Sequence, residues 1–342
     1  MRALILHGAD DLRLDDVPEP VAGPGEITVD VLVALTCATD AKMMRAGAHP
    51  ALGPLPAPLG HELAGVVREA GAGVEWPRPG DEVVVANSAP CLDCAPCRAG
   101  RPNLCRRITY LTGAFAERVR VPAAITARNT HPLPPGLGPD RAAASEPLAC
   151  AVHTARGCRA GGARETLILG GGVQGWFLTA LLARAGNRVT LLDPHPERRA
   201  RALRAGASAA HPVPRGAGDL DLMRRSLGEG EGAALVVEAV GRPAAWEMAV
   251  SLACPGGEVV LHGGCPAGTR IDMPTGPIHY SELTLRGSYH HTPDAFREAL
   301  SLIAAGDIPV GLVLKRPVGL SDVPDLLRAS RGDKHPVMPG LL

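Results

Sequence analysis

The sequence has few aromatic residues and no excess of either charge. Of its 342 residues only 3% are Phe, Trp or Tyr, whereas 46% are hydrophobic, so the core must be mainly aliphatic. The 35 Lys and Arg balance the 35 Asp and Glu, which gives no electrostatic reason to expect nucleic acid or an acidic membrane surface as a partner. No apolar run approaches the ~20 residues that a membrane span requires. We therefore expect a globular protein without nucleic-acid or membrane partners.

Lysine is scarce as well, since only Lys42, Lys315 and Lys334 accompany an otherwise arginine-only set of basic residues. The N-terminal stretch MRALILHGADDLRLDD lacks the build of a secretory signal, because its apolar patch is short and acidic residues follow at once. We therefore expect a cytoplasmic protein. In a reducing compartment, closely spaced cysteines more often bind a metal than form disulfides.

Four of the nine cysteines lie in the stretch CLDCAPCRAGRPNLC, at residues 91–105. Cys91, Cys94, Cys97 and Cys105 have the spacing C-x2-C-x2-C-x7-C. Four thiolates on one loop can close a tetrahedral zinc site, and such a site keeps no position for substrate. The stretch therefore predicts a structural zinc, and an iron–sulfur cluster or a redox-active pair of cysteines is the alternative.

The chain changes character near residue 145, which predicts two domains of an α/β protein. Before it, short apolar runs alternate with Gly and Pro, as is typical of a β-rich domain; these runs are 27–35, 63–70, 81–86 and 116–122. The segment HPLPPGLGPD (131–140) is expected to be a linker. After residue 165, strand and helix patterns alternate, which predicts a parallel sheet flanked by helices. Near the C-terminus we expect a helix over 294–306 and a strand over 309–319.

The segment GGGVQG (170–175) fits the motif G-x-G-x-x-G and has the right context. A strand pattern precedes it and a helix pattern follows, so the glycines would allow close approach of a pyrophosphate to the helix N-terminus. Asp193 ends the next strand pattern, where its carboxylate would accept hydrogen bonds from a ribose and repel a 2′-phosphate. NAD is therefore favoured over NADP, although Arg198 and Arg199 lie close enough to soften the preference. The expected cofactor-binding residues are Gly170, Gly172, Val173, Gln174, Gly175, Asp193 and Arg198.

A second metal site is suggested by CATD (37–40), LGHELAG (59–65) and SEPLACAVHT (145–154). A catalytic zinc uses about three protein ligands and keeps one position for water or substrate. Cys37 and His61 are suitable ligands, and Glu62 and Glu146 can each supply an oxygen. Which of the two glutamates binds zinc directly is left open by the sequence.

The ordered combination of these motifs resembles the zinc-dependent medium-chain dehydrogenases along the whole chain. The matching segments include CATD, GHE (60–62), the cysteine loop and GGGVQG, together with GAGVEWPRPGDEVV (71–84) and GAFAERVRVPA (113–123). The stretch EPLACAVH (146–153) is most similar to the sorbitol and threonine dehydrogenase branch. The resemblance implies a GroES-like catalytic domain of residues 1–145 and 290–342, with a structural-zinc lobe at about 88–108. It also implies a Rossmann domain of residues 146–289, two zinc ions per chain and a homodimer or homotetramer.

The resemblance further implies roles for single residues. Zinc would acidify the substrate hydroxyl while hydride passes to the nicotinamide. Thr39 matches the residue that relays the hydroxyl proton, and Asp40 would orient the ligand His61. Lys42 stands where some family members carry a relay histidine, so the relay beyond Thr39 is open. His290 and His291 are candidates for contact with substrate.

Only seven residues, RRITYLT, separate Cys105 from Gly113. This connection is shorter than is usual in the family and borders the expected substrate pocket, so relatives are a poor guide to the substrate at this point. Because few aromatic residues are present to line that pocket, we expect a polyol, sugar, cyclitol or amino-alcohol as substrate. The leading prediction is thus a zinc- and NAD-dependent oxidoreductase acting on a secondary alcohol or ketone. The alternatives are a zinc-independent reductase, a redox-neutral enzyme that holds NAD tightly, and a non-catalytic nucleotide-binding protein with structural zinc only.

Overall fold

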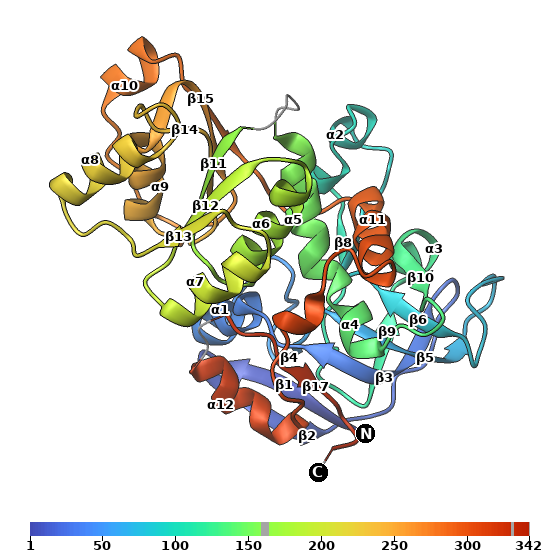
Figure 1. Cartoon of the computed structure of the whole chain (residues 1–342). Helices are drawn as coiled ribbons and strands as arrows, with labels where there is room; N and C mark the ends of the chain where they lie inside the picture. The colour runs from blue at the N-terminus through green and yellow to red at the C-terminus, as the bar shows by residue number, and fades with distance from the viewer. Residues whose placement is uncertain (159–163, 330–331, 342) are drawn as a thin grey trace. The chain divides into compact units, whose positions relative to one another are not determined.

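The structure is a computed structural model that describes residues 1–158, 164–329 and 332–341. It divides into two compact units, Met1–Ala149 with His291–Leu342 as unit 1 and Cys150–His290 as unit 2. The expected first boundary, at 145/146, and the observed one both fall in helix α5 (Ser145–Gly157). The two units are described separately below, and Figure 1 labels their helices and strands.

Unit 1 is rich in antiparallel sheet. Its largest sheet has six strands in the order β10-β6-β5-β3-β17, with β9 also pairing with β3. A three-stranded sheet has the order β2-β1-β4, and β7 pairs with β8. The strands are β1 (Arg2–Gly8), β2 (Asp11–Asp16), β3 (Ile27–Leu35), β4 (Ala57–Pro58), β5 (Leu63–Ala70), β6 (Glu82–Val85), β7 (Ser88–Ala89), β8 (Thr109–Tyr110), β9 (Arg118–Val121), β10 (Thr130–Pro132) and β17 (Pro336–Val337).

The core of unit 1 is built from aliphatic side chains and Phe115. Strand β3, with the sequence ITVDVLVAL, buries Ile27, Val29, Val31, Val33 and Leu35 on one face, whereas its other face includes Asp30 and the exposed Leu32. It pairs with β5, β9 and β17. This strand therefore fixes the position of the residues that follow it, where the candidate site begins.

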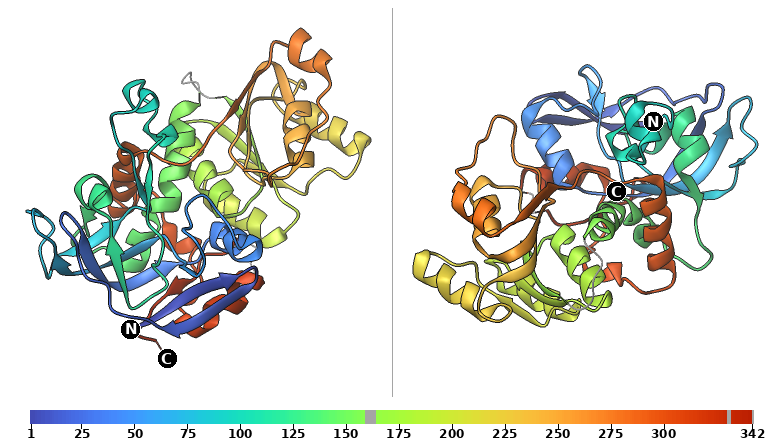
Figure 2. Two further views of the ribbon diagram at one scale, coloured as in Figure 1. Left: turned by 180° about the vertical axis from the view of Figure 1, so that it is seen from behind. Right: turned by 90° about the horizontal axis from the view of Figure 1, so that it is seen from above.

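The described helices of unit 1 are short apart from α11. They are α1 (Ala38–Ala46), α2 (Ala95–Arg98), α3 (Ala123–Asn129), α4 (Pro139–Ala143), α11 (Pro293–Ala304) and α12 (Val323–Arg328), with the 3-10 helices η1 (Pro102–Leu104), η2 (Val310–Leu312) and η3 (Leu320–Asp322). Figure 2 shows both chain termini within this unit, and Arg2 Nη2 donates to the carbonyl of Pro339 at 3.3 Å.

Unit 2 contains a six-stranded parallel sheet in the order β13-β12-β11-β14-β15-β16. Numbered within the unit, this is the 3-2-1-4-5-6 order of a doubly wound nucleotide-binding sheet. Its strands are β11 (Glu165–Leu169), β12 (Arg188–Leu192), β13 (Ala209–His211), β14 (Ala233–Glu238), β15 (Ala253–Leu261) and β16 (Thr284–Gly287). Its helices are α6 (Val173–Arg184), α7 (Pro196–Arg204), α8 (Ala217–Ser226), α9 (Pro243–Ser251) and α10 (Thr275–Tyr280).

The structure agrees with the expected α/β class and corrects two local expectations. Residues 309–319 were expected to form a strand, but they form η2 followed by isolated bridges of Leu314 with Lys334 and Val318 with Val337. The Gly and Pro residues of PVGL and KRPVG favour that irregular path over a regular ladder. The expected linker 131–140 instead contains the end of β10 and the start of α4.

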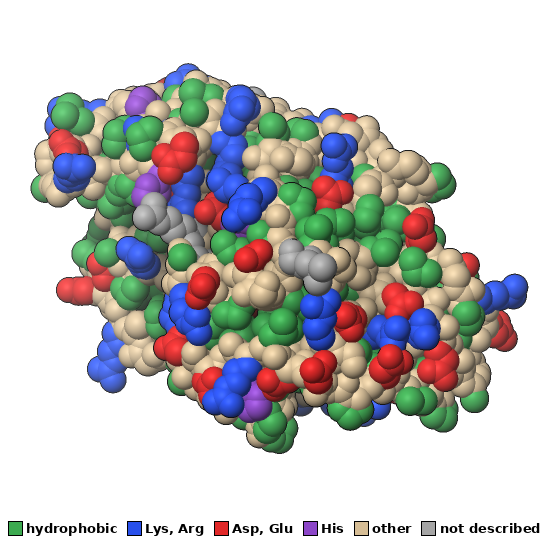
Figure 3. All heavy atoms as spheres, turned by 90° about the horizontal axis from the view of Figure 1, so that it is seen from below, with side chains coloured by type: hydrophobic (Ala, Val, Ile, Leu, Met, Phe, Trp, Pro, Cys, Tyr) green, Lys and Arg blue, Asp and Glu red, His purple; other side chains and the backbone are tan. Residues whose placement is uncertain are grey.

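The surface reflects the balanced composition. In the face shown in Figure 3, basic and acidic side chains are interspersed over the lower part, and several basic side chains adjoin in the upper middle. Within the described part of the chain, no helix combines the length and apolarity needed to cross a membrane.

Candidate active site and metal centres

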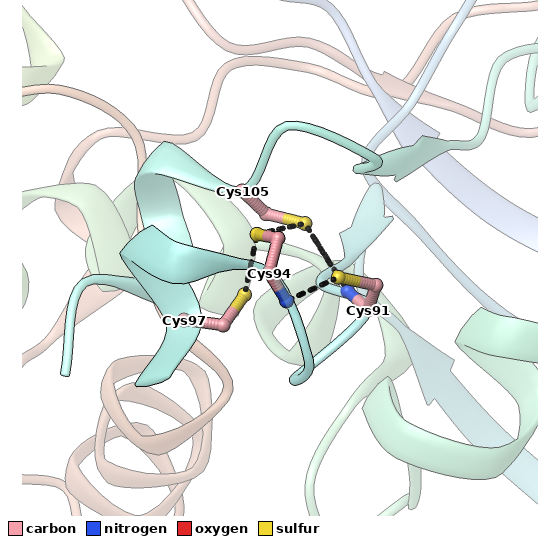
Figure 4. A group of neighbouring side chains, drawn as sticks. All are labelled: Cys91, Cys94, Cys97 and Cys105. Carbon is pink, nitrogen blue, oxygen red and sulfur yellow. Dashed lines mark hydrogen bonds between the residues drawn. The ribbon is translucent and has the colours of Figure 1, made fainter. Parts of the chain in front are cut away.

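The four-cysteine loop brings its sulfur atoms together (Figure 4). Cys91 follows β7, Cys94 precedes α2, Cys97 lies in α2 and Cys105 follows η1. The Sγ atoms are 3.5 Å apart for Cys94 and Cys97, 3.8 Å for Cys94 and Cys105, and 3.4 Å for Cys105 and Cys91. These distances are too long for disulfides, whose sulfurs are ~2.05 Å apart.

The same distances suit a tetrahedral metal. Zn–S bonds of ~2.3 Å in tetrahedral geometry place the sulfurs ~3.8 Å apart. Backbone N–H groups also point at the sulfurs, from Cys91 to Cys105 at 3.2 Å and from Cys94 to Cys91 at 3.3 Å. Backbone hydrogen bonds from Asp93 and Cys94 lower the pKa of the Cys91 thiol to about 6. The sulfur positions therefore suit four ligands of one zinc ion.

The second cluster begins where β3 ends. Cys37 caps the N-terminus of α1, and its Sγ accepts a hydrogen bond from the Thr39 backbone at 3.5 Å. The Cys37 N–H donates to Asp40 Oδ2 at 3.1 Å, which completes a reciprocal cap. This local arrangement fixes the thiol at the N-terminus of α1.

Asp40 also positions His61. The fully buried Asp40 carboxylate lies 3.0 Å from His61 Nδ1 through its Oδ1, which also accepts the Gly60 N–H at 3.3 Å. Gly60 has a φ of 91°, and a Cβ there would lie 2.5 Å from the Phe115 backbone nitrogen. With Nδ1 held by a carboxylate, Nε2 is left as the atom that can bind a metal.

Glu62 completes the cluster from the following residue. One ligand atom each from Cys37, His61 and Glu62 lie within 4.8 Å of one another, and His61 Nε2 is 3.7 Å from Glu62 Oε1. Burial raises the pKa of Glu62 to about 7, although the nearby Lys334 ammonium opposes the rise. Burial lowers the pKa of His61, but the Asp40 carboxylate outweighs it and the net pKa is well above the usual value.

The donor set fits a catalytic zinc. A thiol, an imidazole and a carboxylate converge here, and these are donors of the kind that zinc prefers. One oxygen of that carboxylate, Glu62 Oε2, is buried and has no hydrogen-bond partner. A buried carboxylate oxygen without a partner carries a desolvation cost, and a cation would remove it.

Glu146 lies in the first turn of α5 and is held by Asn87. Asn87 Nδ2 donates to Glu146 Oε1 at 2.7 Å, and Asn87 Oδ1 is 2.9 Å from His291 Nε2. Burial raises the pKa of Glu146 to about 7, and the charge of His61 opposes the rise. Glu146 therefore interacts electrostatically with His61 and Cys37. Among the described residues, however, the group of ligand atoms within 4.8 Å of one another consists of Cys37, His61 and Glu62 and does not include Glu146.

The remaining candidate residues take varied positions. Thr39 is half-buried in the first turn of α1, and Lys42 is exposed on the same helix. His291 is buried, with 2% of its surface exposed, and packs near Phe296 at 5.9 Å between ring centroids. It therefore acts in the structure as a partner of Asn87. His290, with a φ of 60°, closes unit 2 and lies beside Tyr289.

The glycine turn of unit 2 links β11 to α6. Gly170 has a φ of 98°, and a Cβ on Gly175 would lie 1.7 Å from the Gly170 carbonyl oxygen. Side chains at Gly170 and Gly175 are therefore excluded, whereas Gly172 caps α6 with open space where its Cβ would be. The free N–H groups of the first helical turn, which includes Val173 and Gln174, are suited to bind a pyrophosphate.

Asp193 is already engaged within the turn. Its Oδ2 accepts the Gly171 N–H at 2.7 Å and its Oδ1 accepts the His195 N–H at 2.8 Å. Only 2% of its surface is exposed, and Arg198 Nη1 lies 3.7 Å from Oδ2. A ribose would have to share this carboxylate with the backbone and reach it past the Arg198 side chain.

Two residues of the site were not among the sequence candidates. Lys334 is buried, and its ammonium contacts Glu62 Oε1. Its only sequence signal is that lysine is rare in this chain. Asn87, which links Glu146 to His291, has no signal at all, because a lone Asn after a strand pattern is typical of turns.

Comparison with known proteins gives a consistent family. The model of the alcohol dehydrogenase GroES-like domain matches residues 23–134, and that of the zinc-binding dehydrogenase matches residues 175–305. An L-threonine 3-dehydrogenase of Streptomyces avermitilis is 33% identical over 332 residues, with 94% of each chain covered. The L-galactonate-5-dehydrogenase of Escherichia coli is 28% identical over 319 residues, which cover 92% of this chain and 90% of that one.

A solved structure is similar over almost the whole chain. A protein of Sinorhizobium meliloti assigned as a zinc-binding dehydrogenase, bound to NADP, superposes with a TM-score of 0.89. It is 30% identical, and the match covers 99% of each chain. The GroES-like and Rossmann architecture expected from the resemblance is thereby confirmed.

Proposed function

Because the chain belongs to the zinc-dependent medium-chain alcohol dehydrogenases, in the branch similar to sorbitol and threonine dehydrogenases, we propose that it oxidises a secondary hydroxyl of a small polyol, sugar, cyclitol or amino-alcohol. Its family makes it an oxidoreductase that uses zinc and a nicotinamide cofactor. The observation that carries the proposal is the convergence of Cys37, which is half-buried, with the buried His61 and Glu62 within 4.8 Å. Relatives that act on threonine and galactonate support the hydrophilic substrate class.

In the proposed site, Cys37, His61 and one of the two glutamates would hold the catalytic zinc. When bound, zinc supplies Lewis acidity that lowers the pKa of a substrate hydroxyl. Asp40 holds the Nδ1 side of His61, so the imidazole stays oriented with Nε2 toward the cluster. The Thr39 hydroxyl, in the same helical turn, is the proposed acceptor that passes the substrate proton outward, and Lys42 is a candidate further along that path.

The four cysteines of the loop would hold a second zinc, which gives two ions per chain. This zinc would act structurally, because all four positions are filled by thiolates. It would tie together a loop in which Cys105 is the only buried member of the quartet. The loop would therefore owe its fixed shape to the metal more than to apolar packing.

For the cofactor, we propose NAD as the preferred nicotinamide dinucleotide. The negative charge of Asp193 at the end of β12 supports this preference, because it would repel a 2′-phosphate. The ion pair with Arg198 reduces that repulsion, so the preference is expected to be modest. We also propose the domain limits given above and a cytoplasmic location. We further propose that the protein is a homodimer or homotetramer, which light scattering of the purified protein tests.

The first experiment is elemental analysis of zinc per chain in the purified protein, followed by turnover assays. We expect two zinc ions per chain and NAD reduction with polyols, cyclitols, sugars or amino-alcohols. One zinc per chain, with no turnover after added zinc, would rule out the catalytic zinc. Activity with aromatic alcohols but none with polyols would contradict the substrate class. NAD that co-purifies through gel filtration, without net NADH formation, would favour the redox-neutral alternative.

A further inference from the structure

Lys334 is a charged residue buried inside unit 1. Only 4% of its surface is exposed, and its Nζ contacts Oε1 of Glu62, itself fully buried. Lys and Glu are almost never fully buried unless they are paired. The two residues are 272 positions apart in the sequence, so the contact arises only in the folded state.

The backbone around Lys334 is fixed next to the cluster of candidate zinc ligands. The neighbouring His335 exchanges hydrogen bonds with Thr36, the residue before Cys37: its N–H donates to Thr36 Oγ1 at 2.9 Å, and its carbonyl accepts the Thr36 N–H at 3.1 Å. The Lys334 carbonyl accepts the Lys315 N–H at 2.8 Å. These three hydrogen bonds, one at the Lys334 carbonyl and two at His335, fix the backbone that carries the ammonium.

The contact with Lys334 gives the two carboxylate oxygens of Glu62 different environments. Oε1 is taken by Lys334, whereas Oε2 is buried and has no hydrogen-bond partner. Cys37 lies in the same group of potential ligand atoms as this carboxylate. A Cys37 thiolate and a Glu62 carboxylate balance one divalent ion, so the buried Asp40 and Glu146 carboxylates near them would leave an excess of negative charge, which one ammonium offsets.

We propose that Lys334 is a positioning residue for the catalytic zinc: its ammonium holds Oε1 of Glu62, the oxygen 3.7 Å from His61 Nε2, and so fixes this carboxylate beside Cys37 and His61 for the metal. Lys334 touches neither substrate nor metal in this role and acts only through Glu62. The proposal rests on the proposed function, because it requires a zinc ion at Cys37 and His61. In the absence of that ion, the lysine would be a structural ion pair only.

The test compares three substitutions in the full-length protein. Lys334→Met removes the charge with little change in volume, and Lys334→Arg keeps the charge. The matched control is Lys315→Met, because Lys315 lies in the same C-terminal region but its side chain is 46% exposed and pairs with Asp333 at 3.7 Å. The affinity for zinc is measured by competition with a chromogenic chelator, and the site geometry by the visible absorption of the cobalt-substituted protein.

We expect Lys334→Met to lower the affinity of one of the two zinc sites by ~10–100-fold, as is usual when a partner of a metal ligand is lost. The cobalt spectrum of that site should change, whereas Lys334→Arg should restore most of the affinity and Lys315→Met should behave as wild type. Unchanged or tighter zinc binding in Lys334→Met would overturn the proposal. If Lys334→Met does not fold, Lys334→Gln, which keeps a polar head without the charge, replaces it.

A double-mutant cycle with Glu62→Gln separates positioning from general stability. If Lys334 acts through Glu62, adding Lys334→Met to Glu62→Gln should cost little further zinc affinity. Equal losses in both backgrounds would show independent effects and would overturn the positioning role. A wild-type protein that binds only one zinc would refute the proposed function itself, an outcome distinct from failure of the Lys334 proposal.

Discussion

Replacing Asp40 with Asn tests whether one buried carboxylate organises the candidate catalytic site. Asp40 accepts hydrogen bonds on both oxygens, from Cys37 N–H at 3.1 Å on Oδ2 and from Gly60 N–H at 3.3 Å on Oδ1, where His61 Nδ1 also lies at 3.0 Å. An amide offers one oxygen, so its NH2 group must face a donor. The least costly orientation keeps the oxygen toward His61 and leaves the Cys37 N–H unsatisfied.

The magnitude follows from these contacts. An unsatisfied buried N–H costs about 1–3 kcal/mol, and a charged hydrogen bond is roughly twice as strong as the neutral one that replaces it at His61. Since both bonds fix candidate zinc ligands, we expect zinc affinity at this site to fall by ~10–100-fold, which corresponds to about 1.4–2.7 kcal/mol. The metal-free protein should also lose about 2 kcal/mol of unfolding free energy.

The assay is a zinc competition titration, with urea unfolding of the metal-free protein beside it. The control is Asp30→Asn on β3, because Asp30 is 40% exposed and pairs with Arg118, where a salt bridge contributes only ~0–1 kcal/mol. The reasoning is refuted if Asp40→Asn retains both zinc sites at wild-type affinity while the cysteine loop is intact. Loss of zinc from the loop instead of the Cys37 cluster would refute it as well.

Three further predictions concern other parts of the molecule. Cys105→Ser should remove one zinc and increase amide hydrogen exchange across residues 91–107, while the second zinc stays bound; loss of both zincs would contradict the separation of the two sites. Asp193→Asn should raise the ratio of kcat/KM with NADP to that with NAD by ~10-fold or more, because a like charge beside the 2′-phosphate is removed; an unchanged ratio would argue against Asp193 as the discriminating residue. Burial lowers the pKa of His262 from 6.5 to about 4, so the stability that its neutral form contributes is present above pH ~6.5 and is lost, by about 3 kcal/mol, as the pH falls toward 4. Urea midpoints of wild type and His262→Asn across this pH range should therefore converge in acid, and parallel curves would contradict the assignment.

The sequence predicts the elements of this fold wherever periodicity is strong. Strand β11 and helix α6 lie before and after the glycine turn at 170–175, as expected, because that turn separates two patterns of different period. The expectation of a strand over 309–319 was wrong, because its apolar residues form isolated bridges and not a continuous ladder. Apolar content alone does not distinguish these two outcomes.

The candidate site was predictable only as far as motif residues carry a chemical signature. Cys37, His61 and Glu62 are soft or oxygen donors in suggestive local patterns, and the fold places them together. Lys334 and Asn87 have no such pattern, because their importance comes from contacts between segments that are distant in the sequence. The sequence also did not predict that two backbone N–H groups donate to Asp193. A position in a motif does not reveal how many hydrogen-bond partners a carboxylate already has.

The discontinuous make-up of unit 1 has a consequence for biosynthesis. Unit 2 is one uninterrupted segment, whereas unit 1 combines residues from before and after it, and strand β17 pairs with β3. On the ribosome, β3 and the cluster beside it are therefore made long before β17 and Lys334 emerge. Metal loaded by the nascent chain would meet Cys37, His61 and Glu62 without their C-terminal support. Maturation of this centre would thus be completed only after synthesis of the last strand, and nascent chains stalled before residue 334 should retain zinc in the cysteine loop but bind it weakly here.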